Sequence, residues 1–288
     1  MKFKKIILLL IPLLMITGCS LQKDKLENST IYTTIYPIRY LTEFMYKDYA
    51  KIESIYPAGA DVLNYELTEK QIKKYAKADL FIYNGLGNEK NIAKNLINKN
   101  KNLLIIDVSN GLTYTNGIKE LWMSPNNYLM LAKNIKDYLK EYLESSIIAG
   151  EVDKKYDELA EILSIKDADL RAIGKKANES GNNTLVVSDN AFKFLENYGF
   201  KIISLDEETL NDNTFNSIQN GFKKKTYSTI LVLDNNYTEK INSLINDYGA
   251  KAIDIKSMTN VENTESIDDY LSNMQDFIDN VRNLCIAN

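Results

Sequence analysis

Short apolar runs rich in β-branched residues alternate with amphipathic stretches along most of the chain. These runs are residues 31–35, 52–56, 80–83 and 103–107 in the first half, and residues 185–188, 202–205, 229–233 and 250–255 in the second half. Such runs predict buried strands, and the amphipathic stretches predict helices between them. A strand–helix–strand succession implies right-handed crossovers and mostly parallel sheets covered on both faces. We therefore expect an α/β protein of two lobes, each a mostly parallel sheet with flanking helices.

The residues between the two sets of strands predict helices. The serine–proline pair at 124–125 is a start signal, with the serine placed to cap the helix and the proline in its first turn. After a break expected near Gly150, an apolar seam over residues 152–177 has helical spacing and is interrupted by Lys166. This seam predicts a rod of about 39 Å, which is longer than one lobe needs. We expect it to bridge the lobes and to keep closure motions small; the alternative is one larger sheet with a helical insertion.

The N-terminus has the pattern of a bacterial lipoprotein signal. Three lysines precede the apolar run 6–16, which is shorter than the roughly 20 residues that a helix needs to cross a bilayer. The run ends in a stretch that resembles a lipobox, which predicts a signal peptide over residues 1–19 and a diacylglycerol on Cys19. Residues 20–29 have too few apolar positions to fold, so we expect a tether. The alternative is a core cysteine behind a buried helix.

Composition and charge exclude several classes of protein. The chain of 288 residues is 44% hydrophobic and 26% charged, which is typical of a globular protein. A net charge of −4 provides no basic surface for nucleic acid. The sequence contains no histidine, which rules out imidazole zinc sites and Ser-His-Asp triads. Cys285 lies on an apolar helical stripe, and we expect it to pack in the core.

Polar residues lie in several loops that follow the predicted strands. In open α/β sheets, ligands bind beyond the carboxyl ends of the strands. Asn64 and Glu120 fall in such loops in the first half, and Asp189 and Lys256 fall in them in the second half. The first three residues offer oxygen ligands, and the two carboxylates stay charged at neutral pH. Two carboxylates across a cleft could resemble the catalytic pair of a glycosidase. No sugar-binding surface is evident in the sequence, so we expect that the protein is not an enzyme.

Five stretches, in order, give the chain a family resemblance. It resembles the ZnuA- and TroA-like substrate-binding lipoproteins of bacterial ATP-binding cassette importers for zinc or manganese. The matching stretches are residues 32–37, 56–61, 78–87, 122–135 and 188–199. The resemblance covers nearly the whole chain after the signal and implies two lobes, a long bridging helix and a divalent metal ion between the lobes. It also implies an importer permease with its ATPase as partner, and we expect a monomer anchored to the membrane through Cys19.

The usual metal ligands of this family are substituted. Its three histidine or glutamate positions and its final aspartate correspond here to Asn64, Glu120, Asp189 and Lys256, with Asp254 as an alternative fourth ligand. An oxygen-only set suits manganese, magnesium or calcium better than zinc. An inward-pointing Lys256 would instead replace the cation by an internal salt bridge. Three hypotheses stay open: a bound divalent ion, a lysine-bridged site without metal, and another small ligand.

The expected organisation follows from these patterns. We predict a signal peptide (1–19), a tether (20–29), an N-terminal α/β lobe (30–123), a helical connector (124–180) and a C-terminal α/β lobe (181–288). The predicted function is metal capture for an importer on the extracytoplasmic face of the bacterial cell membrane. The alternative is a diverged scaffold without metal that acts as a surface adhesin or interaction lipoprotein, or that binds another small ligand.

Overall fold

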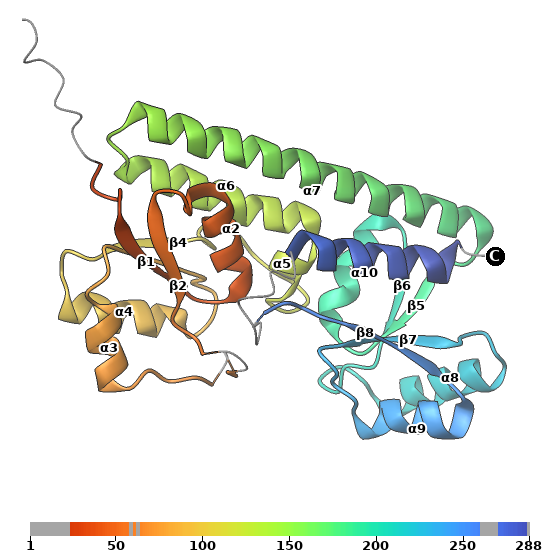
Figure 1. The fold of residues 1–288 in the computed structure, drawn as a ribbon. Helices are drawn as coiled ribbons and strands as arrows, with labels where there is room; N and C mark the ends of the chain where they lie inside the picture. The colour runs from red at the N-terminus through yellow and green to blue at the C-terminus, as the bar shows by residue number, and fades with distance from the viewer. Residues whose placement is uncertain (1–23, 58–59, 62–63, 260–269, 287–288) are drawn as a thin grey trace, which may run out of the picture.

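The computed structural model describes residues 24–57, 60–61, 64–259 and 270–286, and it contains two four-stranded parallel sheets (Figure 1). The first sheet has the order β2-β1-β3-β4. Its strands are β1 (Ser29–Thr33), β2 (Ala50–Ser54), β3 (Leu80–Tyr83) and β4 (Leu104–Asp107). All neighbouring strands run parallel. The predicted α/β class is therefore confirmed for the first lobe.

The second sheet repeats the strand order of the first, as β6-β5-β7-β8. Its strands are β5 (Thr184–Val187), β6 (Lys201–Ser204), β7 (Thr229–Leu233) and β8 (Lys251–Ile255). These strands also pair in parallel. The order places β5 and β7 side by side at the centre of their sheet, so the loops that follow them emerge next to each other.

Each sheet is flanked by the helices that connect its strands. They are α2 (Tyr36–Tyr46), α3 (Glu69–Tyr75) and α4 (Glu89–Lys99) in the first lobe, and the 3-10 helix η1 (Asn190–Tyr198), α8 (Asp212–Lys223) and α9 (Glu239–Tyr248) in the second. The start of α3 shows how the local sequence defines the end of a helix. Thr68 accepts a hydrogen bond from the Gln71 backbone, and the Gln71 side chain accepts one from the Thr68 backbone. This capping box satisfies N–H groups that the first turn would leave unpaired.

Four further helices connect and cover the lobes. They are α5 (Glu120–Met123), α6 (Pro125–Tyr142), α7 (Ser146–Ser180) and α10 (Tyr270–Cys285). In Figure 1, α7 runs along both lobes, with α6 beside it at one end and α10 beside it at the other. Its 35 residues correspond to about 52 Å, longer than the rod expected from the sequence. The single bridging helix is confirmed, and the alternative of one larger sheet is wrong.

The break before this helix lies earlier than predicted. Gly150 lies inside α7, and the chain turns at residues 143–145. The Asp24 carboxylate accepts hydrogen bonds from the backbone N–H groups of Glu144 and Ser145, at 2.8 and 2.9 Å. These bonds stabilise the turn, and the Ser145 side chain caps α7 by accepting from the Ile148 backbone. Tertiary contacts set the position of the break. Gly150 does not end the helix, because a single glycine weakens a helix without stopping it.

The start of α6 matches the prediction only in part. The helix begins at Pro125, but the Ser124 side chain makes no capping hydrogen bond. Lys166, which interrupts the seam of α7, is buried and donates to the Gln275 side chain at 2.8 Å. This polar contact ties α7 to α10 in the middle of an apolar interface.

The expected tether is wrong for the part that the structure describes. Leu26 has no exposed surface, Asp24 is 3% exposed, and Ser29 already belongs to β1. The buried leucine, the Asp24 hydrogen bonds and the Asn28 N–H group that donates to the Tyr49 carbonyl pack this segment although its composition is polar. The predicted signal peptide and Cys19 lie outside the described residues. Among the helices of the described part, none is long and apolar enough to cross a membrane.

The main hydrophobic core is continuous from one lobe to the other. It includes strands of both sheets, one face of α7 and the inner face of α10. Cys285 lies on that inner face, where it is 3% exposed and burial raises the pKa of its thiol to about 11. The prediction that Cys285 packs in the core is confirmed. A shared core makes large independent movements of the lobes costly, because they would expose apolar surface.

Candidate functional site

Two aspartates of the second lobe lie at the carboxyl edge of its sheet. Asp189 follows β5, and Asp234 follows β7 directly. The Asp189 Oδ1 atom accepts the backbone N–H of Ala191 at 2.8 Å, which caps η1. The Asp234 Oδ1 atom accepts the backbone N–H of Ser257 at 2.7 Å. Each carboxylate is therefore fixed through one oxygen by its own lobe.

A lysine of the first lobe meets both carboxylates. Lys119 immediately precedes α5, and its Nζ atom lies 3.1 Å from Asp234 Oδ2 and 3.5 Å from Asp189 Oδ2. The three side chains are 27–38% exposed, so water screens the ion pairs only in part. A positive charge from one lobe thus lies between two negative charges of the other.

Glu120 uses both of its carboxylate oxygens within its own lobe. It is 7% exposed. Oε1 accepts the backbone N–H of Thr115 at 2.8 Å, and Oε2 accepts the backbone and side-chain N–H groups of Asn116, both at 3.2 Å. In this arrangement the carboxylate holds the loop that precedes α5. It could bind an additional cation only by sharing or releasing these donors.

The other residues predicted for the site lie at different places. Asn64 is exposed, and its side chain donates to Asp61 Oδ2 at 2.7 Å. Asp254 is also exposed and accepts a hydrogen bond from the Tyr237 hydroxyl at 2.6 Å. Lys256, the bridging cation of the second hypothesis, lines a small pocket next to α10. The lysine that pairs with Asp189 is Lys119.

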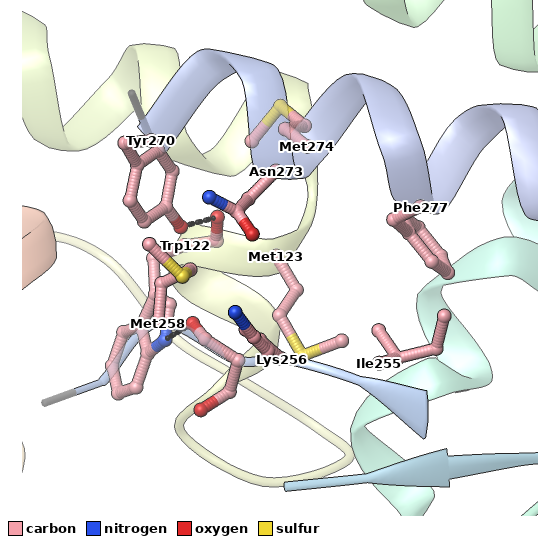
Figure 2. Close-up of a pocket in the computed structure, with 10 residues that line it drawn as sticks. Trp122, Met123, Ile255, Lys256, Met258, Tyr270, Asn273, Met274 and Phe277 are labelled. Atoms are coloured by element: carbon pink, nitrogen blue, oxygen red, sulfur yellow. Dashed lines mark hydrogen bonds between the residues drawn. The ribbon is translucent and has the colours of Figure 1, made fainter. Parts of the chain in front are cut away.

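The small pocket beside Lys256 lies where α5 of the first lobe packs against the end of β8 and against α10 (Figure 2). The buried Trp122 indole donates to the Ser257 carbonyl at 3.1 Å, and the Tyr270 hydroxyl donates to the Trp122 carbonyl at 2.5 Å. Figure 2 draws both hydrogen bonds as dashed lines and shows Met123, Met258 and the exposed Lys256 among the residues that line the pocket. Trp122 therefore connects α5 to the end of β8 and to α10.

The described residues form no cluster of three or more histidine, cysteine, aspartate or glutamate side chains that could hold a metal ion. The set Asn64, Glu120 and Asp189 therefore stays a prediction. Lys119 and Asp234 were not among the residues predicted from the sequence. A signal for both existed, since Lys119 adjoins Glu120 and Asp234 ends the predicted strand 229–233. Their meeting across the boundary depends on the orientation of the lobes, which no local pattern contains.

The fold and the boundary define a two-lobed α/β protein with its strand-end loops at the junction, the architecture implied by the family resemblance. The chain belongs to the family described as "Zinc-uptake complex component A periplasmic", whose profile matches residues 31–284. The resemblance stated from the sequence is confirmed. The family is named for a part of an uptake complex, which is a transport function and not an enzymatic activity.

Characterised relatives are similar over much of the chain. It is 29% identical to the iron-binding protein YfeA of Yersinia pestis, over 63% of this chain and 60% of that protein. It is 28% identical to a metal ABC transporter substrate-binding lipoprotein of Lactococcus lactis, over 67% of each chain. It is 25% identical to the zinc-binding lipoprotein AdcA of Streptococcus pneumoniae, over 94% of this chain and 59% of AdcA. The chain thus spans about three fifths of two of these relatives.

Solved structures share the fold. The zinc-bound ZnuA-like domain of Streptococcus pneumoniae AdcA superposes with a TM-score of 0.72 at 21% identity, covering 90% of this chain and 99% of that domain. The lipoprotein YcdH of Bacillus subtilis superposes with a TM-score of 0.73 at 20% identity, covering 88% and 98%. At this identity the likeness establishes the architecture of two parallel sheets and a long helix.

Proposed function

We propose that this protein is the substrate-binding lipoprotein of an ATP-binding cassette importer and that its cargo is a divalent metal ion, manganese or zinc. The family match over residues 31–284 carries the proposal. Relatives named for manganese and zinc support it. In this proposal the chain is a monomer anchored through Cys19 on the extracytoplasmic face of the membrane, and it delivers the ion to a permease with its ATPase.

The proposed cargo site lies at the boundary between the lobes and uses Asp189, Glu120 and Asn64. Asp189 has the strongest support, because its Oδ2 atom faces the first lobe. Glu120 would contribute after its loop loosens, since its oxygens now accept from Thr115 and Asn116. An oxygen-only set favours manganese over zinc. The two sheets also support the proposed division into lobes at residues 30–123 and 181–288 with a connector at 124–180.

Metal-dependent stability of the full chain, purified in detergent, tests this function. Manganese at about 100 times its dissociation constant should raise the Tm by about 5–10 °C, since such binding stabilises by about 2.7 kcal/mol. Asp189→Asn should reduce this shift by more than half. Asp247→Asn, at an exposed position of α9, is the matched control and should leave the shift unchanged.

Thermal melts with manganese, zinc, calcium and magnesium, together with elemental analysis of the purified chain, provide the measurement. A Tm that no ion moves, with no copurifying metal, would contradict metal capture and leave only the fold assignment.

A further inference from the structure

We propose that the Lys119 ammonium is a built-in cation that competes with a divalent ion for Asp189 and Asp234, and so sets the affinity of the lobe boundary for metal. The inference deepens the proposed function and rests on it. It assigns Lys119 as a residue that sets the metal affinity and adds Asp234 to the residues that accept the cargo.

Two fixed oxygens converge on one cation at the lobe boundary. The Oδ1 atoms of Asp189 and Asp234 accept backbone N–H groups of their own lobe, so each Oδ2 atom is directed at Lys119. Asp234 has a left-handed backbone with φ of +51°, and Asn235 follows with φ of +56°. This tight turn and the bond to Ser257 fix the Asp234 carboxylate in place. Fixed oxygens of this kind suit a metal ion as well as an ammonium group.

The ammonium group and a divalent ion need the same oxygens. The Lys119 ammonium group lies 3.1–3.5 Å from the two Oδ2 atoms. It therefore occupies the place that a divalent ion bound by both oxygens would take. A metal ion bound there would also lie within a few ångströms of a positive charge, and the two would repel each other. Metal binding at these oxygens therefore requires the Lys119 side chain to move away.

The Lys119 side chain can move while its backbone stays in place. It is 30% exposed, and its four-carbon stem is flexible. Partly exposed ion pairs are weak, so displacement lowers the metal affinity without abolishing it. The backbone at Lys119 is held because the next residue, Glu120, fixes the loop through Thr115 and Asn116. The Lys119 side chain can therefore change its conformation while its backbone stays fixed.

Titration of the full chain and of Lys119→Met with manganese and zinc at low ionic strength tests the inference. Methionine keeps much of the length of the side chain and removes the charge. The apparent Kd of Lys119→Met for manganese should fall about tenfold or more, because a nearby positive charge is gone. Asp234→Asn added to Lys119→Met should cancel most of this gain.

Lys140→Met is the matched control. Lys140 is 34% exposed and pairs with Asp153 at the junction of α6 and α7. Its loss should change the manganese Kd less than twofold. Far-UV circular dichroism and thermal melts check the fold of each variant, and Lys119→Gln provides a second neutral side chain if Lys119→Met unfolds.

The outcomes separate this inference from the proposed function. If the wild type binds metal and the Lys119 variants bind equally or more weakly, competition is overturned and the function stands. If only the Lys119 variants bind metal, competition is supported and metal capture by the natural chain is overturned. If neither binds any ion, both are overturned.

Discussion

The two lobes place carboxylates at equivalent sheet edges and use them differently. In the first lobe, the Asp107 carboxylate accepts from Gly85 and Ser109, and Glu120 accepts from Thr115 and Asn116. These groups hold loops of their own lobe. In the second lobe, Asp189 and Asp234 each direct one oxygen across the boundary to Lys119.

The difference shows that residue type and position at a strand end do not by themselves make a ligand. A carboxylate surrounded by backbone N–H groups is already satisfied, and its removal would leave those donors unpaired. A carboxylate with one remaining oxygen can still exchange its partner. We therefore expect acids of the first lobe to act mainly on stability and those of the second lobe mainly on binding.

Gly85→Ala should give the largest loss of stability. A Cβ atom at this position would lie 1.9 Å from Asp107 Oδ2, so the carboxylate would have to move. Moving it disrupts its bonds to Gly85 and Ser109, which should lower the free energy of unfolding by about 2–4 kcal/mol. Urea denaturation measures the change.

Gly150→Ala is the control for Gly85→Ala. A Cβ atom added at Gly150, inside α7, would have no neighbour within 4 Å, so alanine should stabilise the protein by about 0.5–1 kcal/mol. Equal stability of Gly85→Ala and the wild type would contradict a structural role for Asp107.

Glu120→Ala and Asp189→Ala compare the two lobes directly. Loss of the Glu120 carboxylate leaves buried donors at Thr115 and Asn116, and should lower the free energy of unfolding by about 1–3 kcal/mol. Asp189→Ala removes one helix cap and one partly exposed ion pair, and should cost less than the loss of Glu120, about 1–1.5 kcal/mol. Denaturation without added metal gives both values. The reverse order would contradict the division of roles.

Glu89→Gln should change stability in the opposite direction, by up to about 3 kcal/mol near pH 8, and the effect should depend on pH. Glu89 is 5% exposed, and burial, with Asp107 nearby, raises its pKa from 4.5 to about 7. Between these values the folded state keeps a proton that the unfolded state releases, so the wild type loses stability as the pH rises through this window. Glutamine removes this loss, so the variant should be more stable above pH 7 and equal to the wild type near pH 4.

Thermal melts from pH 4 to pH 8 test the Glu89 prediction. The control is Glu69→Gln, an exposed position at the start of α3, which should show no such pH dependence. A difference between Glu89→Gln and the wild type that stays constant with pH would refute the assigned cause.

Much of the fold could be predicted from the local pattern. The predicted strands 80–83 and 229–233 match β3 and β7 residue for residue. The predicted strand 31–35 is displaced by two residues from β1, because pairing with β2 begins at Ser29 and the apolar run continues into the buried loop at Thr34 and Ile35. Apolar periodicity finds a buried segment, whereas strand pairing sets its ends.

Less of the candidate site could be predicted. The sequence placed Glu120 and Asp189 in strand-end loops. Asp189 does lie just after β5, whereas Glu120 is the first residue of α5, and the sequence did not show which groups their oxygens contact. Glu120 bonds to residues only four and five positions before it, yet that choice depends on a loop shape with no regular repeat. Lys119 and Asp234 are 115 positions apart, and their contact depends on how the lobes face each other.

The sequence by itself determined the two α/β lobes, the bridging helix and the family, because apolar periodicity and ordered motifs are local properties. The tertiary structure alone decided which charges meet at the boundary, since the direction of a short carboxylate is fixed by the donors around it. It also decided that Lys119, and not Lys256, pairs with Asp189. Short-range patterns govern burial, whereas electrostatic pairing across lobes follows from their packing.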